Sequence, residues 1–170
     1  MIEVRRARPE DSGPAGRLQV DAWRFTYAGF FSEEYLGSLL YENYETEWRI
    51  ALAENHPRKP RWVAFLNREL VGILIADLPK LEFPGFPNEL RAIYTKPGLQ
   101  RAGLGRALFA AYIDWLKENG ESSFHLWAGA QNTRAHAFYE AMGGRRVAER
   151  NDREFGGKKP IEWAFGWDDL

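Results

Sequence analysis

The segment YTKPGLQRAGLGRALF, residues 94–109, decides the fold because it leads from a strand through a glycine turn into a helix. Gly103 and Gly105 lack a Cβ, so the backbone there can approach a ligand closely. The amides of residues 101–105 precede the helix and are free to bind an anion such as a pyrophosphate. Arg101 and Arg106 could pair with its oxygens. The segment therefore predicts a phosphate-binding loop.

Other glycine-rich phosphate motifs do not fit this segment. A P-loop requires a Lys followed by Ser or Thr, and none follows Gly105. The dinucleotide fingerprint G-x-G-x-x-G would place a glycine at the position of Leu108, which lies on the apolar face of the expected helix. Taken alone, the turn is equally well explained as an ordinary loop that enters a core helix.

Hydrophobic periodicity predicts an alternation of strands and helices along the whole chain. Expected strands cover residues 2–7, 61–66, 70–78, 88–95, 123–130, 145–151 and 160–167. Expected helices cover residues 9–28, 32–54, 104–120 and 132–142, and the proline-rich segment 78–87 is expected to be a stiff loop. The order β-α-α-β-β-β-α-β-α-β-β predicts one α/β domain over residues 1–170, a central mixed sheet with helices on both faces.

The composition of the 170 residues excludes several classes of protein. A net charge of −1 provides no broad positive field for nucleic acid or an anionic membrane. The lack of cysteine excludes disulfides and cysteine-based metal or nucleophile sites, and the three scattered histidines form no metal pair. With no signal-peptide stretch and no apolar run of about 18 residues, we expect a cytoplasmic protein without a metal.

A second segment, WAGAQNTRAHAFYEAMGGRRV at residues 127–147, follows the loop. Together the two segments resemble the GNAT N-acetyltransferase superfamily. The first resembles its acyl-CoA pyrophosphate loop, Q/R-x-x-G-x-G/A, and the second resembles its strand–helix unit, N-x-x-A-x-x-F-Y-x-x-x-G. The resemblance covers residues 88–150 and departs from the family at Arg101, where glycine is frequent, and at Gly144, where an aromatic residue is usual.

The resemblance implies a GNAT-like fold that transfers an acetyl group from acetyl-CoA to a primary amine of a small molecule or peptide. The amine would attack directly in a ternary complex, without a metal. A protein N-acetyltransferase and a non-catalytic acyl-CoA-binding regulatory domain are the alternatives. The last strand, PIEWAFGW at residues 160–167, could pair across a homodimer, as such strands do in some members.

The resemblance also implies an acetyl-CoA site built from the strand, the loop and the following helix. Backbone amides around Ile93 to Thr95 would polarise the thioester carbonyl, and Asn132 would both cap its helix and contact the pantetheine. The implied acetyl-CoA-binding residues are Ile93, Tyr94, Thr95, Gln100, Arg101, Ala102, Gly103, Leu104, Gly105, Arg106, Asn132, Phe138 and Tyr139.

Two residues are candidates for proton transfer. Tyr139 matches the family's tyrosine acid, although an aromatic at helical spacing also suits core packing. Glu89 is the candidate base, because many members place an acid in this strand. Alternation puts Glu89, Arg91, Ile93 and Thr95 on one face, and an exposed ion pair between Glu89 and Arg91 is the equally weighted alternative.

Aromatic residues near the N-terminus are candidates for binding the acceptor. Trp23 and Tyr27 share a helix face because they are four residues apart, and Phe31 follows in the adjoining loop. The family lines its acceptor cleft with this region, whereas core packing is the simpler explanation for Trp23. The polar segment 151–160 is expected to form a hairpin at the rim of that cleft.

Overall fold

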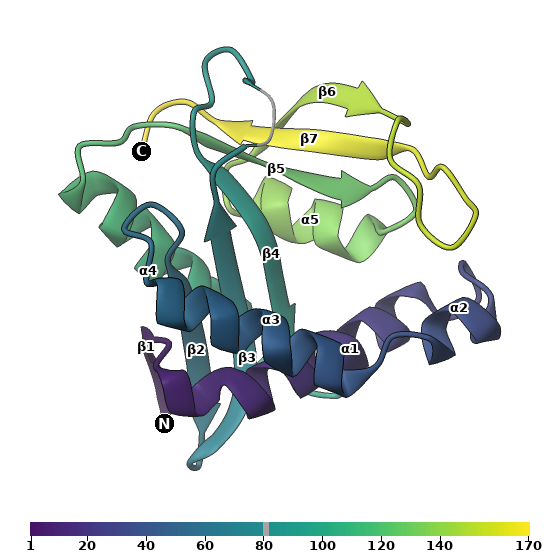
Figure 1. Ribbon diagram of the computed structural model, residues 1–170. Coiled ribbons are helices and arrows are strands. Elements are labelled where there is room, and N and C mark those ends of the chain that lie inside the picture. The colour runs from purple at the N-terminus through teal and green to yellow at the C-terminus, as the bar shows by residue number, and fades with distance from the viewer. Residues whose placement is uncertain (80–81) are drawn as a thin grey trace.

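A mixed seven-stranded sheet organises the computed structural model, which describes residues 1–79 and 82–170 (Figure 1). The strands are β1 Ile2–Arg6, β2 Arg61–Leu66, β3 Glu69–Asp77, β4 Glu89–Thr95, β5 Phe124–Gly129, β6 Arg145–Arg150 and β7 Glu162–Trp167. Their spatial order is β1-β2-β3-β4-β5-β7-β6. Only β4 and β5 pair in parallel within the described residues.

Helices cover both faces of this sheet, as predicted (Figure 1). They are η1 Pro9–Asp11, α1 Ser12–Tyr27, α2 Glu33–Gly37, α3 Tyr41–Glu54, α4 Leu104–Glu118 and α5 Thr133–Ala141. α1 and α3 pack on one face, and α4 and α5 pack on the other. The predicted fold class is therefore confirmed. Residues 80–81, part of the predicted stiff loop, lie outside the described residues.

The prediction of one helix over residues 32–54 is wrong, because the chain breaks between α2 and α3. At the break, the Ser38 hydroxyl donates a hydrogen bond to the Tyr35 carbonyl at 2.6 Å. Arg24 of α1 donates to the carbonyls of Leu36 and Leu39 at 3.1 and 2.8 Å. A side chain from another helix thus satisfies carbonyls that a continuous helix would have bonded internally.

A bulge in β4 changes which side chains face which helices. Leu90 and Ala92 pair with consecutive residues of β3, so Arg91 has no partner opposite it. Leu90 and Ile93 pack with α4, whereas Ala92 and Tyr94 pack with α1 and α3. The extra residue therefore reverses the alternation of side chains along the strand.

The expectation that Glu89, Arg91, Ile93 and Thr95 share one face is wrong for this reason. Glu89 alternates with the strand residue after it, so it lies on the α1 and α3 side together with Tyr94. Ile93 points to the opposite side, toward α4. The bulge thus places Glu89, the candidate base, and Ile93 on opposite faces of the sheet.

β4 and β5 separate soon after they meet. Their ladder has a single register pair, Glu89 with His125, beside a hydrogen bond from the His125 amide to the Asn88 carbonyl at 3.0 Å. Beyond this point the two strands run apart (Figure 1). The part of β4 after Glu89 therefore has no ladder partners on the edge that faces β5. A wedge opens there between the two halves of the sheet.

The last strand, β7, lies inside the sheet. It pairs with β5 along one edge and with β6 along the other, both antiparallel. Because both of its edges are bonded within the same chain, the expectation that the last strand pairs across a dimer is wrong. The edge strands are β1 and β6.

Two helices on one face of the sheet meet at Gly16 of α1. An ideal Cβ at this position would lie 2.5 Å from the backbone nitrogen of Glu45 in α3. Side chains beside the crossing add polar contacts: Arg17 pairs with Glu45 at 2.6 Å, and the Trp48 indole donates to Gln19 at 2.7 Å. The missing side chain therefore sets the distance between α1 and α3.

We expect Gly16→Ala to destabilise the protein by about 1–3 kcal/mol, since a methyl group must force the two helices apart. Gly37→Ala is the matched control, because a Cβ at Gly37 in α2 would meet nothing within 4 Å. Thermal unfolding of both variants checks this. A melting temperature as high for Gly16→Ala as for Gly37→Ala would contradict the close crossing.

Candidate functional site

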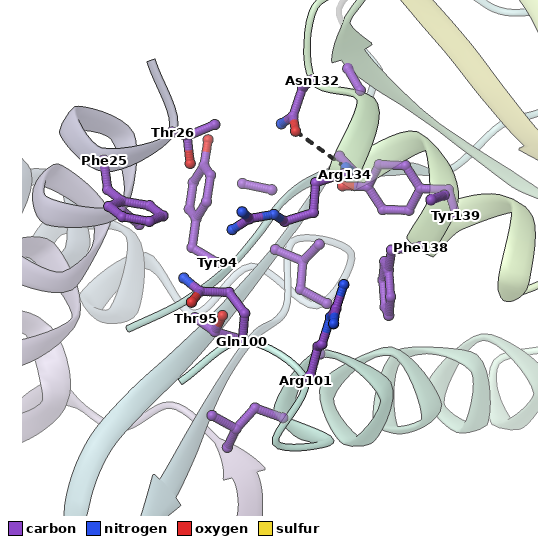
Figure 2. Close-up of a pocket in the computed structure, with 18 of the residues that line it drawn as sticks. Phe25, Thr26, Tyr94, Thr95, Gln100, Arg101, Asn132, Arg134, Phe138 and Tyr139 are labelled. Carbon is purple, nitrogen blue, oxygen red and sulfur yellow. Dashed lines mark hydrogen bonds between the residues drawn. The ribbon is translucent and has the colours of Figure 1, made fainter. Parts of the chain in front are cut away.

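The wedge between β4 and β5 opens into a cavity of about 830 Å³ (Figure 2). Helix α1, strands β4 and β5, the loop before α4, and α5 all contribute to its walls. The lining residues are Ala22, Phe25–Tyr27, Arg91–Thr95, Leu99–Arg101, Gly103–Arg106, Trp127, Ala128, Asn132–Ala135 and Ala137–Tyr139. The cavity therefore spans both halves of the divided sheet.

The loop between β4 and α4 is held by local backbone geometry. The Gly98 amide donates to the Gln100 side chain at 3.0 Å. Arg101 and Gly103 adopt left-handed conformations with φ of 67° and 84°. Gly103 is the N-cap of α4 and offers no side-chain oxygen, so the first amides of the helix lack a side-chain cap. These amides are available to a ligand in the cavity.

Gly105 has a packing neighbour as well as a place in the cavity wall. A Cβ at this residue would lie 3.4 Å from the Phe138 ring of α5. Phe138 also packs edge-on against Phe109 of α4, with ring centroids 6.1 Å apart. The glycine therefore allows α4 and α5 to approach each other beside the cavity.

The predicted acetyl-CoA-binding residues gather around this cavity, with the exception of Ala102, which lies outside its lining. Asn132 lines the cavity and caps α5, where its Oδ1 accepts a hydrogen bond from the Ala135 amide at 3.2 Å (Figure 2). Ile93 to Thr95 form the wall at the unpaired edge of β4. One site thus collects residues that are far apart in the sequence.

The cavity wall is positively charged. Arg91, Arg101, Arg106 and Arg134 line it, and no Asp or Glu does among the residues that the structure describes. Arg91 is paired with Asp77 at 3.2 Å. The uncapped amides of α4 add partial positive charge to the same space. The arrangement suits a ligand that carries more than one negative charge.

Three tyrosines from three elements face the cavity: Tyr27 of α1, Tyr94 of β4 and Tyr139 of α5. Burial raises the pKa of Tyr27 to about 12, and it raises the pKa of Tyr94 and Tyr139 well above the usual phenol value. Each side chain is therefore a neutral phenol at neutral pH and can donate a hydrogen bond to a ligand.

Glu89 lies outside the cavity lining, on the far side of the bulge from Tyr94. Its side chain is half-buried, and this burial raises the pKa of the carboxyl above its usual value. Nearby Arg150 opposes that effect by favouring the charged form, whereas Asp77 adds to it. A proton that travels between the cavity and Glu89 must therefore pass through an intermediate carrier.

Of the three predicted acceptor residues, the structure brings only Tyr27 to the cavity. Trp23 packs behind it at a tilt, with ring centroids 4.4 Å apart. Phe31 is 5% exposed and packs against Trp23 and Phe155 in a separate apolar cluster. Trp23 and Phe31 thus support Tyr27 from the core.

The segment after β6 forms a small hairpin that reaches the N-terminal helices. Phe155 and Lys158 exchange backbone hydrogen bonds at 2.8 and 3.0 Å across a Gly-Gly turn. The Lys158 ammonium donates to the Phe30 carbonyl at 2.5 Å, and Gly156 lies directly against the Tyr35 ring. This hairpin packs over α2 and the turn that follows α1.

Several cavity residues were not identified from the sequence: Phe25, Thr26, Trp127, Thr133 and Arg134. For Arg134 a signal existed, because a cation in the first turn of a helix opposes the helix dipole and calls for an explanation. For Thr26 and Trp127 the sequence holds no such signal. They reach the cavity because β4 and β5 separate, which no local pattern indicates.

Across residues 1–79 and 82–170, no three His, Asp or Glu side chains are grouped so that they could hold a metal ion. Within the same residues, the helices are too short or too polar to cross a membrane.

Sequence comparison relates the chain to acetyltransferases. A sequence model described as the Acetyltransferase (GNAT) family matches residues 20–144. The uncharacterized N-acetyltransferase YuaI of Bacillus subtilis is 33% identical over 183 aligned positions, which cover all of this chain and 95% of the relative. A protein of Thermoplasma acidophilum named spermidine N(1)-acetyltransferase is 26% identical, over 95% of this chain and 98% of its own.

Solved structures share the fold. The PaiA N-acetyltransferase of Thermoplasma acidophilum, in complex with coenzyme A, has a TM-score of 0.77 at 22% identity and covers 96% of this chain and 98% of its own. The YncA protein of Salmonella typhimurium, solved with acetyl-CoA, has a TM-score of 0.74 at 18% identity. The match covers 100% of this chain and 95% of the YncA chain. At these identities the likeness concerns the fold.

Proposed function

This chain belongs to the GNAT family of acetyltransferases, and we propose that it transfers the acetyl group of acetyl-CoA to a primary amine of a small molecule or peptide. The amine attacks the thioester directly while both substrates are bound. The observation that carries this proposal is the cavity between β4 and β5, with its positive wall and its uncapped helix start. The names of the relatives, one a spermidine acetyltransferase, support an amine acceptor.

The residues present fit coenzyme A at the α4 end of the cavity. Loop residues 100–106 would hold its pyrophosphate with backbone amides and the guanidinium groups of Arg101 and Arg106. Asn132 and Phe138 of α5 would contact the pantetheine chain that runs up the wedge. When bound, acetyl-CoA would supply an activated acetyl group beside the unpaired edge of β4.

The unpaired edge of β4 would stabilise the oxyanion that forms when the amine attacks. Amides between Ile93 and Thr95 have no ladder partner in β5, because the two strands have already separated there. Backbone amides fixed in a strand need no reorganisation when the carbonyl oxygen becomes negative. Their rigidity comes from the β3 side, where this part of β4 stays paired.

Tyr139 would assist departure of the CoA thiolate. Its pKa is raised by burial, so the phenol remains protonated and can donate a hydrogen bond to the sulfur as charge develops. Contacts with Phe165 and Trp167, at centroid distances of 5.7 and 6.3 Å, hold the ring in place. The same packing that buries the tyrosine thus keeps it neutral and oriented.

Glu89 would take the proton from the acceptor ammonium through water. An alkyl amine with a pKa near 10.4 must lose its proton before it attacks, which costs about 4.6 kcal/mol at pH 7. The pKa of Glu89 is raised by burial and so lies closer to the working pH than that of an ordinary glutamate. The acceptor itself would lie against Tyr27, with Trp23 and Phe31 supporting that wall.

Calorimetric titration with acetyl-CoA tests the proposal most directly, with NADH and ATP as controls. We expect affinity in the micromolar range for acetyl-CoA and much weaker binding of both controls, since the wedge must also accept a pantetheine chain. Absence of acetyl-CoA binding by folded protein would contradict the proposed function. A screen of amines by thiol release then identifies the acceptor.

Tyr139→Phe should lower kcat by about 100-fold, because a positioned acid contributes about 10²–10⁴ to rate. The affinity for CoA should change little, since the ring and its packing remain. Rapid thiol-release kinetics and calorimetry on the same preparation measure the two quantities. An unchanged kcat would remove the Tyr139 hydroxyl from the mechanism, and it would leave the tyrosine as a packing residue.

Glu89→Gln should move the pH–rate profile toward higher pH. In the parent protein the rate rises as Glu89 loses its proton; in the variant it rises only as the amine loses its own, near pH 10. The raised pKa means that the folded state prefers the protonated carboxyl, so ionisation of Glu89 destabilises the fold above that pKa. The variant should therefore be at least as stable at pH 7, and an unmoved profile would place the base elsewhere.

A further inference from the structure

We propose that Arg150 of β6 is a positioning residue for the candidate base, Glu89. Its guanidinium, held by Glu162 and by the ring of Trp127, keeps the carboxylate of Glu89 charged and ready to take the proton of the acceptor amine. The inference rests on the proposed function and adds to it a residue from outside the cavity lining. Arg150 acts through the charge of Glu89 and touches neither substrate.

Two contacts fix the guanidinium of Arg150. Its Nε donates a hydrogen bond to the carboxylate of Glu162 at 2.9 Å. Its Cζ lies 3.9 Å from the centroid of the Trp127 ring, which is a cation–π contact. The Arg150 side chain is 24% exposed, and its Nη2 is buried without a hydrogen-bond partner in the part of the chain that the structure describes. The cation is thus held in place and shielded, so water and salt screen its charge little.

Arg150 and Glu89 lie on the same face of the sheet. Leu126 of β5 packs on the α4 and α5 side, so alternation along the strand turns Trp127 to the opposite face, where Glu89 also lies. Trp127 follows by two residues His125, the ladder partner of Glu89. Two residues of a strand span only about 7 Å. The ring that carries Arg150 is therefore a near neighbour of Glu89, where β4 and β5 meet.

The charges around Glu89 are not balanced without it. Arg150 and Arg153 share one carboxylate, that of Glu162, and the Nη1 of Arg153 lies 4.0 Å from it. The carboxyl of Glu89 has no ion pair and no hydrogen bond within residues 1–79 and 82–170. A negative charge on Glu89 therefore offsets the positive charge that the two arginines have in excess of Glu162.

Arg150 is the strongest of the charges that favour ionisation of Glu89. Burial raises the pKa of Glu89, and Arg150 opposes this more than Arg91 or Arg153 does. Asp77, opposite Glu89 in β3, adds to the rise. Arg91 pairs with Asp77 at 3.2 Å and has a half-exposed side chain, so its charge is partly offset and partly screened.

The other titratable groups near Glu89 are uncharged or act on Asp77. His125 of β5 is neutral near pH 7, because burial lowers its pKa. Tyr27 of α1 is a neutral phenol. Lys59, before β2, pairs with Asp77 at 3.8 Å. Removal of Arg150 is therefore the single change that should disfavour the charged form of Glu89 most.

The test is the pH dependence of acetyl transfer in Arg150→Gln, with the amine that the thiol-release screen identifies. Without the cation the pKa of Glu89 rises, so the increase in rate should move by about one pH unit to higher pH. Arg146→Gln is the matched control. Arg146 lies on the same strand, over the Trp163 ring at 3.8 Å, and pairs with Glu149 at 2.6 Å, but on the opposite face. Its profile should match that of the parent protein.

Three further measurements show whether the effect passes through Glu89. The profile of Glu89→Gln/Arg150→Gln should equal that of Glu89→Gln alone, because no carboxyl remains to respond. Arg150→Lys, which keeps the charge, should return the profile toward that of the parent. The carbon-13 signal of the Glu89 carboxyl, titrated without substrates, should show the same displacement in Arg150→Gln.

Thermal unfolding checks that each variant is folded. If Arg150→Gln is not, Arg150→Met replaces it, since methionine removes the charge but keeps an apolar side chain against Trp127. An unmoved profile in a folded variant would overturn the proposal and leave Arg150 as a packing residue. An equal shift in Arg146→Gln, or a shift that persists when Glu89 is already glutamine, would also overturn it. Absence of acetyl transfer by the parent protein would instead contradict the proposed function, and the role of Arg150 with it.

Discussion

The separation of β4 from β5 is the constraint on which the rest of the site depends. The two strands share one register pair, Glu89 with His125, and then diverge. Without this divergence, β5 would form hydrogen bonds along the whole edge of β4, and there would be no wedge for a ligand to enter. The sheet remains stable because each half is complete on its other side: β4 pairs with β3, and β5 pairs with β7.

Several features around this wedge lower the stability of the ligand-free protein. The start of α4 is uncapped, Arg101 is left-handed, and Arg134 faces the wrong end of its helix dipole. The carboxyl of Glu89 is held in surroundings that disfavour its charge. Natural sequences depart from local rules mainly at functional sites, and these departures lie in or beside a single cavity.

The cavity wall formed by α1 is built on a different principle, since aromatic packing replaces charge there. Tyr27 faces the cavity, and Trp23, Phe31 and Phe155 pack behind it. Phe155 comes from the hairpin after β6, which joins the far end of the chain to α1 and α2. The wall formed by α1 is thus packed against aromatic side chains of the core, whereas long arginine side chains line the wall formed by the α4 loop and α5.

The sequence by itself determined the features that depend on neighbours in the chain: strand, turn and helix around Gly103, the cap at Asn132, and the α/β order. Local propensities and glycine conformations fix these within a few residues. Contacts between distant segments decided the rest. Arg24 splits a predicted helix, the bulge at Arg91 turns Glu89 away from Ile93, and β7 inserts beside β5. None of these is encoded in a local pattern, because each depends on hydrogen bonds and packing partners that only the folded chain brings together.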